Sequence, residues 1–130
     1  MTGQNQIYCN NCKIMSNSIN KSKLIICSNV LVINLNRGKG LQFDVKLNFE
    51  EYLNIKNFIF YANSPSFYEL IGIVTHFRPS SMSGHFIAFC KSFVDQKLYK
   101  YNDVQVNISS FEEARNTGVP YILFYSYIKS

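Results

Sequence analysis

Short runs of hydrophobic and β-branched residues alternate with clusters of Asn, Ser, Gly and Pro along most of the chain. This pattern predicts β-strands separated by turns. Two stretches, residues 30–33 and 87–90, are continuously apolar, which predicts strands covered on both faces. The runs that qualify as strands are residues 24–27, 30–35, 68–76, 85–93, 98–101 and 121–127.

Helix is expected to be the minor element. Residues 49–53 and 111–116 look helical, and the second stretch follows Ser109 and Ser110 and precedes Gly118, as in a capped helix that ends at a glycine. Residues 61–66 are expected to form a loop. The pattern therefore predicts one α+β domain that consists mostly of antiparallel sheet with a few short helices.

The composition fits a single folded domain. Of the 130 residues, 47% are hydrophobic and 16% are charged, which excludes an intrinsically disordered chain. The 13 basic and 8 acidic residues give a net charge of +5, but the lysines are scattered, so we expect the charge to serve solubility rather than nucleic-acid binding. No apolar run is long enough to cross a bilayer and the polar start is no signal peptide, so we expect an intracellular protein that spans no membrane.

The four cysteines are expected to be reduced thiols. Cys9 and Cys12 are separated by two residues, a spacing that allows both thiolates to bind one Zn²⁺. Two ligands are half of a tetrahedral site, and no second paired spacing is present, so a turn with two unpaired thiols remains an equal alternative. Cys27 and Cys90 lie within apolar runs and are expected in the core.

A candidate catalytic pair comes from the predicted hairpin. His85 follows Gly84 at the start of a strand, beside a flexible turn, and Asn102 and Asp103 come 17 and 18 positions later. If the two strands pair through residues 94–97, Asn102 and Asp103 fold back beside His85. A side-chain oxygen placed there would orient a histidine base, although a lone histidine is more often structural.

Taken in order, these segments resemble the C-terminal half of the ubiquitin-specific proteases. The resemblance runs from residue 8 to residue 127 and rests on the order of many short motifs. The matching segments are residues 8–12 for the second zinc pair of the fingers region, 30–37 for the strand ending in Leu-Lys-Arg-Phe, 49–55 for Phe-Pro-x-x-Leu-Asp-Leu, 68–76 for the strand that enters the active-site loop, 84–86 for Gly-His-Tyr, 98–106 for Trp-x-x-Phe-Asn/Asp-Asp-x-x-Val, and 120–125 for Ala-Tyr-x-Leu-Phe-Tyr.

The resemblance implies a palm-and-fingers half of a papain-like cysteine isopeptidase. Residues 8–27 would belong to the fingers, and residues 28–130 to the sheet that carries the catalytic histidine. His85 would activate the nucleophile, Asn102 would be its principal orienter, and Asp103 would have a secondary role. Catalysis would need no cofactor, and zinc would be structural. The implied partners are ubiquitin or ubiquitinated proteins and the N-terminal half of the same catalytic domain.

The Asn-Thr-Cys box that carries the nucleophile in this family has no counterpart in the sequence. The isolated chain is therefore expected to be inactive, because a histidine base needs a thiol to activate. Two other functions remain open. The chain could be an inactive ubiquitin-binding module or, less favoured, a small basic zinc protein that binds nucleic acid.

Overall fold

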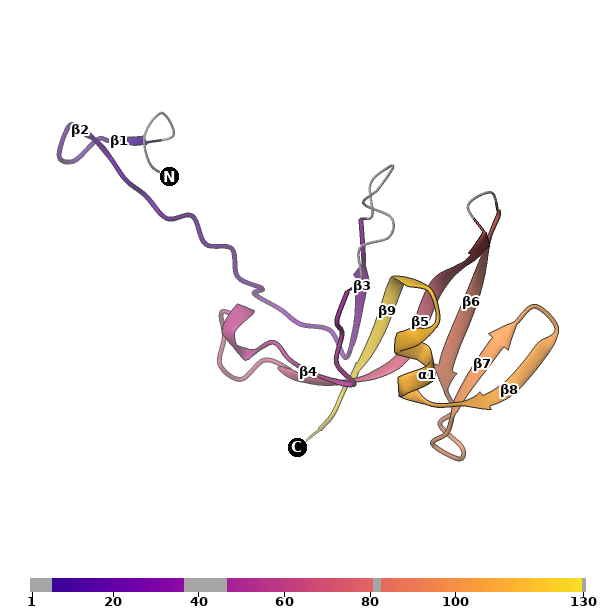
Figure 1. Cartoon of the computed structure of the whole chain (residues 1–130). Coiled ribbons are helices and arrows are strands. Elements are labelled where there is room, and N and C mark those ends of the chain that lie inside the picture. Colours follow the sequence, from indigo (N-terminus) through magenta and orange to yellow (C-terminus); the bar gives the residue numbers. More distant parts are fainter. Residues whose placement is uncertain (1–5, 37–46, 81–82, 130) are drawn as a thin grey trace.

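The structure, a computed structural model, describes residues 6–36, 47–80 and 83–129. Its main feature is a seven-stranded sheet whose paired strands run antiparallel (Figure 1). The strand order is β3-β9-β5-β6-β7-β8, and β4 pairs with β5 outside this path. The predicted α+β fold with a mostly antiparallel sheet is confirmed. The strands are β3 (Val30–Asn34), β4 (Tyr52–Asn54), β5 (Phe67–Ser80), β6 (Ser83–Lys91), β7 (Leu98–Asn102), β8 (Gln105–Ser109) and β9 (Val119–Tyr127).

A separate two-stranded sheet precedes the main one. It consists of β1 (Ile7–Cys9) and β2 (Ile14–Ser16), and an extended segment leads from it to β3 (Figure 1). The strand predicted over residues 24–27 is wrong, since Leu24 alone forms a bridge, to Ile59. Leu24 N donates to the Phe58 carbonyl and the Leu24 carbonyl accepts from Phe60 N, at 2.7 Å each, and residues 25–27 pair with no strand in the described part of the chain.

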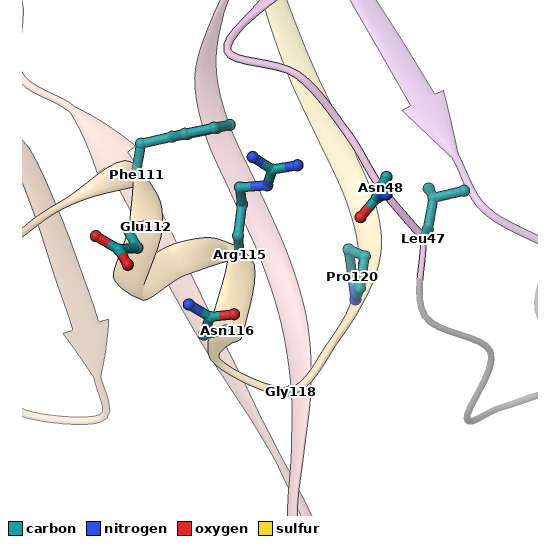
Figure 2. Close-up of a pocket in the computed structure, with 8 residues that line it drawn as sticks. All are labelled: Leu47, Asn48, Phe111, Glu112, Arg115, Asn116, Gly118 and Pro120. Carbon is teal, nitrogen blue, oxygen red and sulfur yellow. The ribbon is translucent and has the colours of Figure 1, made fainter.

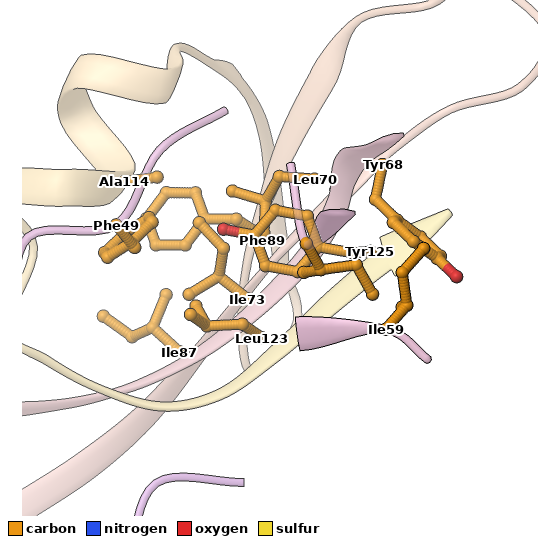
Figure 3. Packing of buried hydrophobic residues seen from close by; sticks show 11 residues of the cluster. Phe49, Ile59, Tyr68, Leu70, Ile73, Ile87, Phe89, Ala114, Leu123 and Tyr125 are labelled. Carbon is orange, nitrogen blue, oxygen red and sulfur yellow. The ribbon is translucent and has the colours of Figure 1, made fainter. Parts of the chain in front are cut away.

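One face of the sheet carries the hydrophobic core. Directly opposed residues share a face, so the pairs Thr75–Ile87 and Ile73–Phe89 place their side chains on the same side. The helix α1 (Phe111–Asn116) covers this side with Ala114 (Figure 3). The cluster contains Phe49, Ile55, Ile59, Tyr68, Leu70, Ile73, Ile87, Phe89, Ala114, Leu123 and Tyr125.

The opposite face is more open than the apolar runs suggested. Val32 is 54% exposed and Phe86 55% exposed, so the expectation that both faces are covered is wrong for the described part of the chain. Cys90, expected in the core, is exposed on this face, whereas Cys27 is partly buried against the core. The only α-helix in the described ranges has six residues and covers the core face of the sheet, so no α-helix in these ranges covers the opposite face.

The helix predicted over residues 111–116 is confirmed, and its cap is provided by Ser110. The Ser110 Oγ accepts a hydrogen bond from the Glu113 main-chain N at 3.1 Å, which satisfies one of the free N–H groups at a helix start. Beyond the helix, Gly118 has a φ of 68°, and a Cβ there would lie 2.4 Å from the His76 carbonyl oxygen. Only glycine fits this position.

The helix predicted over residues 49–53 is wrong. Tyr52–Asn54 form β4, which pairs with the first part of β5, and the Glu51 carbonyl accepts from Leu70 N at 2.8 Å. The free edge of β5 supplies these partners, which outweigh a weak helical preference. A short 3₁₀ turn, η3 (Lys56–Phe58), and the predicted loop at residues 61–66 follow. No helix in the described ranges is long and apolar enough to cross a membrane.

Candidate active site

The hairpin between β6 and β7 brings the predicted site residues together. Ala88 lies opposite Tyr101 in this hairpin. The next residue, Asn102, therefore shares the face of Ile87, and His85 lies two residues before Ile87 on that same face. His85 and Asn102 are diagonal neighbours at the end of the hairpin, within reach of each other.

The two side chains are in contact. A hydrogen bond joins His85 Nε2 to Asn102 Oδ1. An amide oxygen can only accept, so the bond places the ring proton on Nε2 and leaves Nδ1 as the basic nitrogen. The His85 side chain is 38% exposed. The contact holds the imidazole in one tautomer and one orientation while part of the ring stays accessible, as a general base requires.

Asp103 approaches the same ring differently. β7 ends at Asn102, and Asp103 has a φ of 52°, a left-handed conformation that aspartate adopts more readily than most residues. Its Oδ2 lies 3.8 Å from His85 Nε2, and its side chain is 77% exposed. The carboxylate is thus a long, solvent-exposed neighbour of the ring, and ion pairs in such settings contribute little.

An ion pair missed by the sequence analysis supports the strand that carries Asn102. Lys100 lies on β7, and its Nζ is 2.8 Å from the Glu113 carboxylate on α1. Hydrogen bonds from Lys100 and then from Ser109 lower the pKa of Glu113. No short-range sequence signal points to this pair, because it depends on α1 lying over the core face of β7.

Cys9 is the last residue of β1 and Cys12 lies in the turn that leads to β2, where Lys13 N donates to the Cys9 carbonyl at 2.7 Å. Hydrogen bonds from the Cys12 main chain and side chain are the main effects that lower the pKa of Cys9, which favours its thiolate form. No third cysteine, histidine or carboxylate joins them in the described ranges. These residues therefore supply two of the four ligands that a structural zinc site needs.

Hollows occur elsewhere on the molecule, and the two of largest volume among those described are as follows. One, of about 330 Å³, lies between α1, the start of β9 and residues 47–48. Figure 2 shows Arg115 and Asn116 from the helix on one side, and Pro120 near Asn48 on the other. The second, of about 520 Å³, is mostly apolar and lies beside Leu31 and Leu53. The predicted catalytic residues line neither of these two hollows, and the His85 side chain is partly open to solvent.

The sequence matches the family model for ubiquitin carboxyl-terminal hydrolases over residues 1–125. The chain belongs to the ubiquitin carboxyl-terminal hydrolase family. This confirms the resemblance to ubiquitin-specific proteases that the motifs indicated. The match includes His85, Asn102, Asp103, Cys9 and Cys12.

Relatives of this chain are much longer than the chain itself. It is 32% identical over 130 residues to the probable ubiquitin carboxyl-terminal hydrolase 16 of Schizosaccharomyces pombe, a match that covers 96% of this chain and 28% of the relative. It is 31% identical over 132 residues to ubiquitin carboxyl-terminal hydrolase 25 of Arabidopsis thaliana, covering 97% of this chain and 20% of that protein. The chain thus spans less than a third of the length of these relatives.

Solved structures show the same arrangement. The chain superimposes on the SAGA Ubp8/Sgf11/Sus1/Sgf73 DUB module bound to ubiquitin aldehyde with a TM-score of 0.76 and 31% identity, covering 98% of this chain and 30% of that one. A form of that module bound to monoubiquitin gives the same TM-score at 32% identity and the same coverage. Both structures therefore contain the fold described above as one part of a larger chain.

Proposed function

We propose that this chain supplies the general base and its orienting residue to a thiol-dependent deubiquitinase. The single observation that carries the proposal is the hydrogen bond between His85 Nε2 and Asn102 Oδ1. It leaves Nδ1 free to take a proton from a cysteine thiol, while Asn102 fixes the ring. Asp103, 3.8 Å away, adds a secondary electrostatic contribution once the ring is protonated.

The nucleophile comes from another segment in this proposal. Cys90 lies on the face of β6 opposite His85, and Cys27 packs against the core. Cys9 and Cys12 are in the separate β1–β2 sheet (Figure 1). We expect the N-terminal half of the catalytic domain to provide the thiol, and the isolated chain to have no hydrolytic activity.

The bond cleaved is the amide that joins the C-terminus of ubiquitin to an amine. The thiolate attacks the carbonyl carbon, and the protonated His85 ring then gives its proton to the departing amine. Water, deprotonated by the same ring, cleaves the thioester that remains. Support for ubiquitin comes from the relatives, which are named as ubiquitin hydrolases, and from the similar modules solved with ubiquitin and ubiquitin aldehyde.

A structural zinc ion shared with another segment belongs to the same proposal. Cys9 and Cys12 have the donor type that zinc prefers, but the described residues provide only these two ligands. No step of the hydrolysis depends on the ion. An intracellular location also fits, because all four cysteines are free thiols.

A ubiquitin vinyl-sulfone probe tests the proposal. A longer protein that joins this chain to a nucleophile-bearing segment should be labelled, and the label should disappear with His85→Ala. The isolated chain should not be labelled. A longer protein that binds ubiquitin but is never labelled would instead be an inactive ubiquitin-binding module, and specific labelling of any cysteine of the isolated chain would overturn the assignment of the nucleophile.

A further inference from the structure

His76 packs directly on the residue that precedes the candidate base. A Cβ built on Gly84 would lie 2.1 Å from His76 Nε2 and 2.2 Å from His76 Cε1. Carbon–nitrogen contacts of that length do not occur, so a side chain at position 84 would displace the His76 ring. The absence of a Cβ at Gly84 is what allows the ring to rest against the main chain.

The same ring also contacts the residue that follows the base. The His76 and Phe86 ring centroids are 4.7 Å apart, and Tyr121 lies 5.8 Å from His76 and 5.4 Å from Phe86. The register of β5 against β9 shifts between Val74 and Thr75. The shift falls at Tyr121, which lies between Pro120 and Ile122 on β9, and irregularities of this kind redirect nearby side chains.

The rings of His76, Phe86 and Tyr121 lie on the face of the sheet opposite the His85 side chain. His76 is paired with Phe86 across β5 and β6, so the two side chains share a face, and the His85 side chain projects from the other face. Gly84 and Phe86 flank His85 in sequence, and His76 touches both. The main chain on each side of His85 is therefore held from the face opposite its imidazole.

We propose that His76 is a positioning residue that fixes the β6 main chain so that His85 keeps its hydrogen bond to Asn102. This inference rests on the proposed function, in which His85 is the base. His76 itself takes no proton from the nucleophile, because its ring is on the face of the sheet away from Asn102. His76 positions the β6 main chain through its contact with Gly84.

The test uses NMR of the ¹⁵N-labelled 130-residue chain, which contains only two histidines. Two-bond ¹H–¹⁵N spectra distinguish a ring with its proton fixed on Nε2 from a ring that averages between tautomers. We expect the unmutated chain to show the fixed form for His85. His76→Ala and Gly84→Ala should each convert His85 to the averaged form, the first by removing the ring and the second by displacing it.

The double variant His76→Ala with Gly84→Ala is decisive. Because Gly84→Ala acts through the ring, it should add nothing once the ring is gone, and the double variant should match His76→Ala. If Gly84→Ala alone does not fold, restored folding in the double variant supports the same contact. Gly72→Ala is the matched control, since its methyl group would lie 3.3 Å from the movable Phe124 side chain and should leave His85 unchanged.

Several results would overturn the inference. One is an unchanged His85 tautomer spectrum in a folded His76→Ala or Gly84→Ala variant. Another is a double variant in which the effects of the two substitutions on this spectrum add up. A third is a double variant that, like Gly84→Ala alone, does not fold. An averaged His85 ring in the unmutated chain would remove the contact that His76 is proposed to hold. None of these readouts needs a substrate, so a longer protein without deubiquitinase activity would contradict the proposed function separately.

Discussion

Lys100 and Glu113 form an ion pair, with 2.8 Å between Nζ and Oε1, that joins β7 to α1 two residues before Asn102. Hydrogen bonds from Lys100 and Ser109 lower the pKa of Glu113 below its usual value of 4.5. A lowered carboxyl pKa adds stability above the usual value and loses it as the pH falls through the lowered one. Glu113→Gln should therefore be less stable than the unmutated chain at neutral pH.

The difference between these two proteins should vanish as the pH falls from about 4.5 through the lowered pKa, because both then carry an uncharged side chain at this position. Urea unfolding at a series of pH values measures it. Glu112→Gln is the control, since it removes a charge from the same helical turn and keeps the pair with Lys100. A difference between Glu113→Gln and the unmutated chain that stays constant down to low pH would contradict the prediction.

Ser110 should contribute to stability as the cap of α1. Ser110→Ala removes the acceptor for the Glu113 main-chain N–H and should lower the free energy of unfolding by about 1 kcal/mol. Ser110→Asp keeps a capping oxygen and should retain most of the stability. Denaturant unfolding of the three proteins checks both expectations, and an equal loss in the two variants would show that the cap is unimportant.

Asn102 should matter more than Asp103 in an enzyme that contains this chain. His85→Ala should abolish turnover, whereas Asn102→Ala should lower kcat/KM by roughly tenfold to a thousandfold if orientation contributes a few kcal/mol. Asp103→Ala should cost less, because its carboxylate is 77% exposed and lies 3.8 Å from the ring nitrogen. Steady-state kinetics of the two variants side by side decide the assignment, which is wrong if a folded Asp103→Ala variant is the more damaged.

The isolated chain should not hold zinc tightly. Half of a tetrahedral site forfeits much of the binding free energy that four ligands provide. Metal analysis after treatment with a mild chelator should find far less than one zinc ion per chain, with Cys12→Ser as the matched control. Stoichiometric zinc that survives the chelator and disappears in Cys12→Ser would contradict this, unless sedimentation shows two chains sharing the ion.

The sequence predicted best those features that interactions between residues close in sequence determine. The apolar runs and the turn residues between them predicted the β6–β7 hairpin. Side chains alternate between the two faces of a strand, and this alternation was enough to place Asn102 beside His85. Ser110 predicted the start of α1 because a capping hydroxyl acts within one helical turn. These features depend on residues that are close in sequence.

Features that depend on distant partners were not predicted. Tyr52 and Leu53, within the stretch predicted as helix, belong to β4 because β5 offers a free edge, which no local signal reveals. The apolar run at residues 87–90 indicated two covered faces, yet Cys90 lies on a face without a covering element in the described ranges. The contact between His76 and Gly84 was also not predicted, because it depends on how a side chain on one strand lies diagonally across the neighbouring strand.

The local nature of the His85–Asn102 pair has a consequence for the order of folding. The two residues are 17 positions apart on adjacent strands, so closing the chain between them costs little entropy. Hairpins form in about 1–10 μs, whereas docking of separate domains takes milliseconds or longer. We therefore expect His85, the proposed base, to be aligned early and locally, before any slower assembly that brings a thiol to it.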